Sequence, residues 1–237
     1  MHLQKLTFNL AYILLIGSSI LTGFESLNTF PKEIVPLKHI LSIETCVTII
    51  ASIAYAFLTQ SYTTKQNFDL TFYRYLDWFA TTPLLLLSLI IYLSYLKNKD
   101  ENKQTPETDD DTFNIILKDN KIIIIILLNF LMLVFGYMGE TKLLNYIGAN
   151  MLGFIPFILM LYLIWKHYCH SSNIYVFIAF TIVWSLYGIV YYFDNNNKNI
   201  GYNILDIISK VGFGILIWYQ VVQYKLETID VELETTN

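Results

Sequence analysis

The chain has 237 residues, of which 55% are hydrophobic and 14% charged, and its formal net charge is −4. This apolar composition excludes an ordinary soluble domain and a disordered chain, and it is typical of an integral membrane protein. The basic residues form no concentrated patch, which argues against a nucleic-acid-binding protein.

Seven apolar segments follow one another, each long enough to cross a hydrocarbon core of about 30 Å as a helix. We therefore predict an all-α, seven-helix transmembrane bundle, a single domain over residues 1–237 that spans the lipid bilayer several times. The predicted helices are 6–24, 36–60, 70–96, 121–139, 146–167, 173–193 and 201–225.

Polar stretches separate and follow these segments. Residues 98–120 form an acidic connection that we predict to be a flexible cytoplasmic loop, and residues 226–237 an acidic cytoplasmic tail. The lysines gather in those loops that lie inside if the N-terminus is outside, which predicts an outside N-terminus and a cytoplasmic C-terminus. The spacing of the four histidines predicts no metal site. Cys46 and Cys169 are expected to be small apolar side chains rather than a disulfide.

The second segment carries an acid, Glu44, within LSIETCVTIIASIAY. An ionisable residue at membrane depth is a candidate functional group. Three interpretations stay open: a proton donor, a cation-coordinating group in a pore, or a protonated carboxyl bonded to a neighbouring helix.

The third segment, FYRYLDWFATTPLLLLSLIIYL, places Arg74, Asp77 and Thr81 on one helix face, with Ser88 two turns deeper. An Arg–Asp pair that reaches toward water at a helix end would explain Arg74. It does not explain Asp77, because a long apolar run follows that residue.

The seventh segment, YNILDIISKVGFGILIWYQVV, holds Lys210 in mid-helix, four residues after Asp206. A buried ammonium needs a partner, and Asp206 lies one turn away on the same face. A desolvated lysine is also suited to form a Schiff base with an aldehyde. Two acids, an arginine and a lysine nearly balance in charge, which predicts that Arg74, Asp77, Asp206 and Lys210 form one cluster inside the bundle.

RYLDWFATTPLLLL and LDIISKVGFG strongly resemble the microbial (type 1) rhodopsins, and the likeness covers nearly the full chain. The resemblance implies a retinal protein rather than an enzyme, with all-trans retinal on Lys210 as a protonated Schiff base. Asp77 would be the primary counterion and proton acceptor, Asp206 the second counterion and Arg74 the extracellular gate. Thr81 would bond Asp77.

The resemblance also implies a pocket for retinal. The run VWSLYGIVYYF matches the family pattern at Trp184 and Tyr187, but Gly188 replaces a proline and Tyr191 a tryptophan. The fifth-segment run FIPFILMLY matches mainly at Met160. The implied lining residues are Trp78, Leu85, Met132, Gly136, Met160, Trp184 and Tyr187.

The kind of transport is indicated by Asp77, Thr81 and Ser88, a set that resembles rhodopsins of large algal viruses. Asp77 with Thr81 resembles outward proton pumps and also many channels, and it argues against a chloride pump. Ser88 occupies the donor position of efficient pumps, but a serine supplies no proton by ionising, so reprotonation is expected to be slow.

We predict a light-driven outward proton pump that forms homo-oligomers. The alternatives are a light-gated cation channel and a photosensor that signals to a partner. The proton-release carboxylates of the best-known archaeal pump have no match. Asn196 and Lys198 fall near their positions, with Asp194 close by as a candidate substitute.

Overall fold

The computed structural model of the protein describes the backbone of residues 2–64, 70–101 and 118–235. Most of the predicted loop 98–120 and the last two residues of the predicted tail lie outside these described residues. The described chain is entirely helical between its turns. The elements are α1 (His2–Ser26), η1 (Lys32–Ile34), α2 (Val35–Thr64), α3 (Leu70–Asp100), α5 (Asn120–Glu140), α6 (Tyr146–Tyr168), α7 (Ile174–Val190), α8 (Asn195–Asp206), η2 (Ile207–Gly212) and α9 (Phe213–Thr235).

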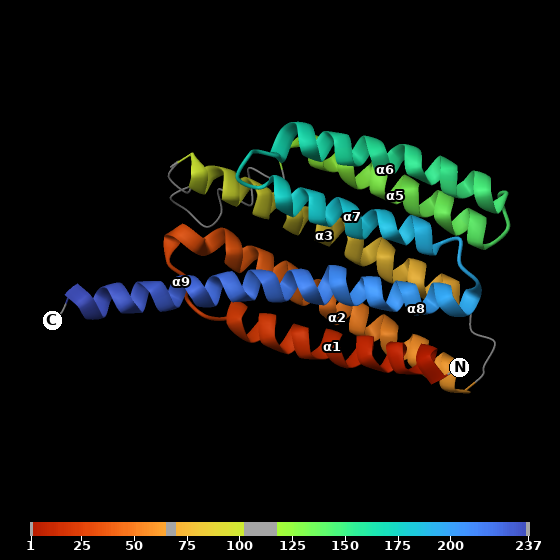
Figure 1. Ribbon diagram of the computed structural model, residues 1–237, viewed down its shortest axis with the longest axis horizontal. Helices are drawn as coiled ribbons and strands as arrows, with labels where there is room; N and C mark the ends of the chain where they lie inside the picture. The colour runs from red at the N-terminus through yellow and green to blue at the C-terminus, as the bar shows by residue number, and fades with distance from the viewer. Residues whose placement is uncertain (1, 65–69, 102–117, 236–237) are drawn as a thin grey trace.

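The described helices form seven rods, because α8, η2 and α9 follow one another without a break (Figure 1). Six rods are long and apolar enough to cross a membrane, and the 17-residue α7 is close to the lower limit for a span. The predicted all-α seven-helix bundle is therefore confirmed.

Some predicted boundaries were wrong. The last rod begins at Asn195 rather than at residue 201, because the Asp194 side chain caps it, and its helix continues through the predicted tail to Thr235. The third helix runs to Asp100 rather than ending at residue 96.

The rods are arranged as a closed ring in chain order, and Figure 1 shows them running side by side along the bundle. Helix α1 packs on α2, α2 on α3, α3 on α5 and α5 on α6, while α8 contacts both α7 and α1 and closes the ring. We call the end of the bundle where α1 begins the amino end, and the end where α9 leaves it the carboxyl end.

Polar caps fix where several helices begin. Asp119 accepts a hydrogen bond from the Lys121 N–H at the start of α5, and Asn145 accepts from the Ile147 and Gly148 N–H groups at the start of α6. These side chains satisfy N–H groups that have no partner within the helix. Side-chain hydrogen bonds therefore help to determine where α5 and α6 begin, at the two ends of the bundle.

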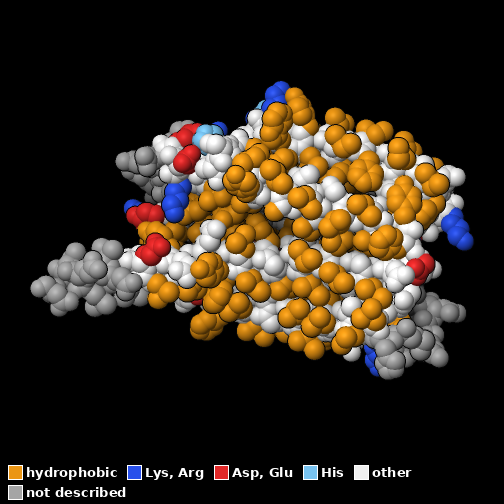
Figure 2. All heavy atoms as spheres, viewed as in Figure 1, with side chains coloured by type: hydrophobic (Ala, Val, Ile, Leu, Met, Phe, Trp, Pro, Cys, Tyr) orange, Lys and Arg blue, Asp and Glu red, His pale blue; other side chains and the backbone are white. Residues whose placement is uncertain are grey.

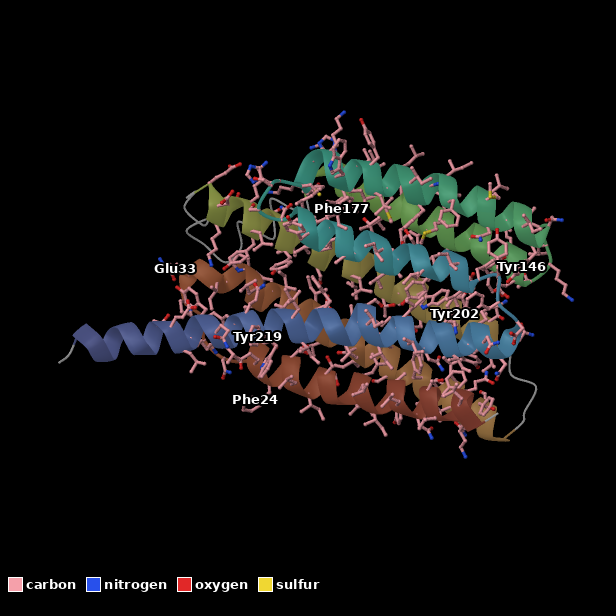
Figure 3. All side chains as sticks on the ribbon, in the orientation of Figure 1. Phe24, Glu33, Tyr146, Phe177, Tyr202 and Tyr219 are labelled. Carbon is pink, nitrogen blue, oxygen red and sulfur yellow. The ribbon has the colours of Figure 1, made fainter. Side chains whose placement is uncertain are left out.

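The face of the bundle seen in Figure 2 is apolar along its length. Phe24 is 74% exposed, on the outside of the bundle, whereas Tyr202 lies between the rods (Figure 3). An apolar surface of this extent suits contact with lipid tails. Four of the buried charged side chains, Arg74, Asp77, Asp206 and Lys210, lie together inside the ring, where they form the site described next.

Candidate functional site

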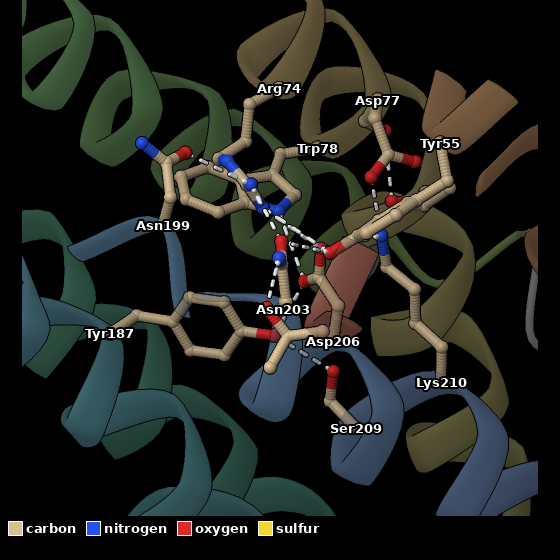
Figure 4. A network of polar contacts seen from close by, with 12 residues as sticks. Tyr55, Arg74, Asp77, Trp78, Tyr187, Asn199, Asn203, Asp206, Ser209 and Lys210 are labelled. Carbon is tan, nitrogen blue, oxygen red and sulfur yellow. Dashed lines mark hydrogen bonds and ion pairs between the residues drawn. The ribbon is translucent and has the colours of Figure 1, made fainter. Parts of the chain in front are cut away.

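Lys210 lies inside the ring in η2, where the last rod widens into a π-helix. Such wide turns are frequent at functional sites. The Lys210 side chain is 1% exposed. Its Nζ donates to Asp77 Oδ2 of α3 at 2.5 Å and lies 3.7 Å from Asp206 Oδ2, one turn earlier in the same rod (Figure 4). The structure thus brings one amine and two carboxylates from different helices together.

Each of the two Asp206 carboxylate oxygens accepts two hydrogen bonds. Its Oδ1 accepts from Tyr187 Oη at 2.8 Å and from Trp78 Nε1 at 3.2 Å. Its Oδ2 accepts from Tyr55 Oη at 2.8 Å and from Arg74 Nη1 at 3.5 Å. A carboxylate with this many donors is stabilised as an anion and fixed in position.

Arg74 is held on the amino side of this cluster. Its Nη2 donates to Asn203 Oδ1 at 2.8 Å and to Asn199 Oδ1 at 3.2 Å. The guanidinium also lies near the faces of four aromatic rings, including Tyr202 at 5.4 Å. The ion pair of Arg74 is with Asp206. Arg74 and Asp77, which the sequence places on one helix face, thus have different partners across the bundle.

Asp77 is less well satisfied than Asp206. Its Oδ2 accepts from Lys210, and its Oδ1 has no hydrogen-bond partner among the described residues. The Thr81 hydroxyl donates to the main-chain carbonyl of Asp77 at 2.8 Å, not to the carboxylate. Thr81 therefore bonds Asp77 but leaves its carboxylate free to interact with Lys210.

An apolar cavity of about 110 Å³ extends from Lys210 between α3, α5, α6 and α7. Six of the seven residues that the resemblance implies as lining face it: Trp78, Leu85, Met132, Gly136, Trp184 and Tyr187. Met160 does not. It is fully buried in the hydrophobic core, further along α6 toward the carboxyl end. Helix α6 lines the cavity instead with Asn150, Gly153, Phe154 and Phe157.

Two glycines give the cavity its shape. A Cβ added at Gly136 would lie 2.6 Å from Tyr75 Oη, and one at Gly188 would lie 2.5 Å from the Phe154 ring. Gly188, which departs from the family pattern, therefore makes room for Phe154 in the cavity wall. Tyr191, the other departure, also lines the cavity and stacks on Tyr146 with ring centroids 4.2 Å apart.

Glu44 and Ser88 lie apart from this network, toward the carboxyl end. Both are fully buried, and they are neighbours on α2 and α3. The two Glu44 carboxylate oxygens, Ser88 Oγ and Ser18 Oγ make no hydrogen bond of ordinary length and angle among the described residues, although Ser88 lies close enough to interact with the Glu44 carboxyl. A Cβ added at Gly214 would lie 3.4 Å from Ser18 Oγ and 3.7 Å from Glu44 Cβ, so α9 passes directly against this group.

Asp194 serves as a helix cap. Its carboxylate accepts from the N–H groups of Asn196 and Asn197 and from the Asn197 side chain at the start of α8. These hydrogen bonds, chiefly those from Asn197, hold the pKa of the exposed Asp194 carboxyl below its ordinary value. The group suggested as a substitute release carboxylate thus has a structural role at the surface.

Sequence reasoning missed several members of the network: Tyr55, Asn199, Asn203 and Ser209, the last bonded to Tyr187 Oη at 2.9 Å. For Asn199 and Asn203 a signal was present. They precede Asp206 and Lys210 at helical spacing in one rod, and together these four residues form a polar stripe. Tyr55 had no such signal, because its partners lie on other helices.

Comparison with known proteins agrees with this geometry. Residues 3–224 match the family model described as bacteriorhodopsin-like protein. The viral rhodopsin OLPVRII is similar in structure, with a TM-score of 0.77 and 28% identity over 94% of this chain and 99% of that one. A blue-light-absorbing proteorhodopsin from Med12 shares the fold, with a TM-score of 0.72 and 22% identity over 94% and 98% of the two chains.

A green-light-absorbing proteorhodopsin of Gamma-proteobacterium EBAC31A08 is 27% identical over 167 residues. That match spans 62% of this chain and 60% of the relative's length.

The chain belongs to the bacteriorhodopsin-like family of microbial rhodopsins, and the resemblance seen in the sequence is confirmed. Members of this family are transporters and receptors rather than enzymes. The protein is an integral membrane protein that crosses the bilayer several times.

Proposed function

We propose that the protein binds all-trans retinal at Lys210 and pumps protons outward when illuminated. The observation that carries this proposal is the buried Lys210 amine, at the end of an apolar cavity and 2.5 Å from Asp77. The family membership supports it, because microbial rhodopsins bind retinal.

The residues present fit this cofactor. Retinal is a long apolar polyene, and the cavity offers flat walls from Trp78, Trp184 and Tyr187 along its length. Bound through the Lys210 nitrogen, retinal would supply light absorption and an isomerisation that changes the proton affinity of that nitrogen. The work of the protein is then to hold and move a proton around Lys210.

The two carboxylates take different parts in this proposal. Asp77 receives the proton from the Lys210 nitrogen, because the distance is short and Asp77 Oδ1 has no described donor. Asp206 remains a fixed counter-charge, since four donors stabilise its anionic form. Arg74 balances the second negative charge, and it lies on the amino side of the cluster, where the proton would leave.

The direction of transport depends on the orientation, which we infer from the lysine distribution: the amino end lies outside and the carboxyl end in the cytoplasm. The continuous polar network then lies on the outer side of Lys210. On the inner side, Ser88 and Glu44 are the buried polar groups through which a proton would return. We expect that return to be slow, because a serine stands at the donor position. The homo-oligomeric state stays a prediction.

A light-gated cation channel is the second candidate. It is favoured by one observation: the cluster of four buried oxygens of Ser18, Glu44 and Ser88 between α1, α2, α3 and α9, none of which makes a hydrogen bond of ordinary length and angle among the described residues. Oxygen atoms of this kind suit a partly dehydrated cation as well as water.

Illumination of the protein in cells and vesicles supplied with all-trans retinal separates these functions. A pump acidifies the medium of unbuffered cells without a pre-existing gradient, and a protonophore abolishes the signal. A channel gives photocurrents that reverse near the cation equilibrium potential, and a photosensor gives neither.

Retinal binding is tested by Lys210→Ala, which we expect to abolish the visible absorption band. Lys166→Ala, at an exposed lysine near the end of α6, is the matched control and keeps the band. A visible band that survives in Lys210→Ala contradicts the proposal.

A further inference from the structure

A second cavity, of about 150 Å³, lies at the amino end between α3, α5 and α8. Arg74 and Asn199 border it on the side of the Lys210 network, and Glu140 and Lys198 also line it. A cavity of this volume has room for more than one water molecule. Polar groups thus continue beyond Arg74 toward the end of the bundle.

Glu140 and Lys198 form a nearly buried ion pair at this cavity. Lys198 Nζ donates to Glu140 Oε1 at 2.9 Å and to Oε2 at 3.0 Å, and the side chains are 9% and 11% exposed. Glu140 is the last residue of α5, whereas Lys198 lies in the first turn of α8. The pair therefore joins two rods at the end where the cavity approaches the surface.

Two tyrosines hold Lys198 independently of Glu140. Its Nζ donates to Tyr146 Oη at 2.9 Å and lies 5.1 Å and 5.6 Å from the ring centroids of Tyr146 and Tyr191. Cation–π contacts and this hydrogen bond stabilise the ammonium even when the carboxylate is neutralised. Glu140 can therefore gain and lose a proton without leaving an unsupported cation.

We infer that Glu140 is the group that receives the proton leaving past Arg74 and releases it to the medium. This inference rests on the proposed function. Among the described residues that line the cavity, Glu140 is the one carboxylate. Asp194 is engaged as the cap of α8, and Asp206 lies on the far side of Arg74, within the Lys210 network.

The step involves protons alone. A Glu140 oxygen forms an O–H bond with a proton passed along the cavity, which converts the carboxylate to the neutral acid while Lys198 keeps its charge. The O–H bond then breaks, the proton goes to bulk water, and the ion pair with Lys198 forms again. Electrons and heavy atoms stay in place.

Release is followed with a pH-indicator dye in the medium after a flash, on protein loaded with all-trans retinal. We expect Glu140→Gln to slow release roughly a hundredfold, so that it follows uptake, with the visible absorption band unchanged. Glu140→Asp retains a carboxylate and restores early release. Glu25→Gln is the matched control, because it removes the carboxylate of the Glu25–Lys225 pair at the opposite end. Release in the control stays as in the wild type.

The inference is overturned if Glu140→Gln releases its proton as early as the wild type, even when its melting temperature falls. That result would show that the ion pair only joins two helices, and the proposed pump would stand. If the wild type moves no protons in light, both fail together. If Glu140→Gln does not fold, infrared difference spectra decide: a light-induced carboxylic acid band must shift in Glu140→Asp, and an unshifted band overturns the inference.

Discussion

Asp77 and Asp206 face the same amine, but their surroundings differ. Asp206 has donors from Tyr55, Arg74, Trp78 and Tyr187, whereas Asp77 has Lys210 and an oxygen without a described partner. At the scale of single residues, this asymmetry supports the proposal that Asp206 stays a fixed charge and Asp77 accepts the proton. The two acids differ because of the side chains that donate hydrogen bonds to Asp206, more than because of its distance from Lys210.

Removing one of those partners is expected to weaken the folded state. Tyr187→Phe keeps the ring in the cavity wall but deletes the donor to Asp206 Oδ1. Loss of a hydrogen bond to a buried charge costs about 1–3 kcal/mol, so the temperature at which the visible band is lost should fall. Tyr162→Phe, on the exposed side of α6, is the control. Equal melting temperatures for the two variants would show that this bond contributes nothing.

The buried group at Ser88 allows a second test at the same scale. Ser88→Asp places an ionisable donor next to Glu44, and we expect the late photocycle to become faster, measured by flash photolysis. Ser42→Asp, at an exposed position of α2, introduces the same acid elsewhere and leaves the rate unchanged.

Glu44→Gln is expected to alter either the rate of reprotonation after a flash or the conductance measured under voltage clamp. If it alters neither, Glu44 is only a neutral carboxyl bonded within the bundle.

At the scale of the helices, contact between α5 and its neighbours depends on Gly139. A Cβ at this position would collide with the Tyr191 hydroxyl and with Ala149 Cβ of α6. Gly139→Ala is therefore expected to destabilise the bundle by about 1–3 kcal/mol, measured as a lower melting temperature. Gly17→Ala in α1 is the control, because an added Cβ meets nothing within 4 Å. Equal effects of the two changes would contradict this account of the α5 interface.

The helices themselves could be predicted from hydropathy, because lipid-facing rods need long apolar segments. Their ends were less predictable, since the Asp194 cap and the continuation of α9 depend on local hydrogen bonds and on packing.

Within the site, the pairing of Asp206 with Lys210 could be predicted from their spacing on one rod. The contact of Tyr55 with Asp206 could not, because it joins α2 to α8 and leaves no periodic signal. Met160 does not line the cavity, because the family motif predicts its helix but not the depth along α6 at which the cavity ends.

At the scale of the whole molecule, the two ends of the bundle differ. The amino end contains the cavity with Arg74 and Glu140, and the carboxyl end contains the pair Glu25–Lys225 with Lys38 and Lys225 over the Phe30 ring. Lysine counting predicts that the amino end lies outside. The inferred proton release at Glu140 would be outward only with this orientation.

Cysteine labelling tests the orientation. With Cys46 and Cys169 replaced by alanine, a cysteine at Lys142, in the turn after α5, is expected to react with a membrane-impermeant maleimide on intact cells. A cysteine at Ser171, in the turn after α6 at the carboxyl end, is the control and reacts only after the membrane is opened. The reverse pattern would invert the inferred direction of pumping.

The π-helix at Lys210 affects where the last rod can gain or lose a residue. A wide turn holds one residue more than a regular turn, and each α-helical residue advances the side-chain direction by about 100°. Asn203 and Asp206 face the interior before this turn, and Ile217 and Val221 face it afterwards. Deleting a single residue there could convert the wide turn to a regular one and keep the two halves in phase, whereas the same deletion elsewhere in the rod would rotate one half by about 100° and turn its inward stripe away. Length changes in this rod are therefore compatible with the fold only where they preserve that phase.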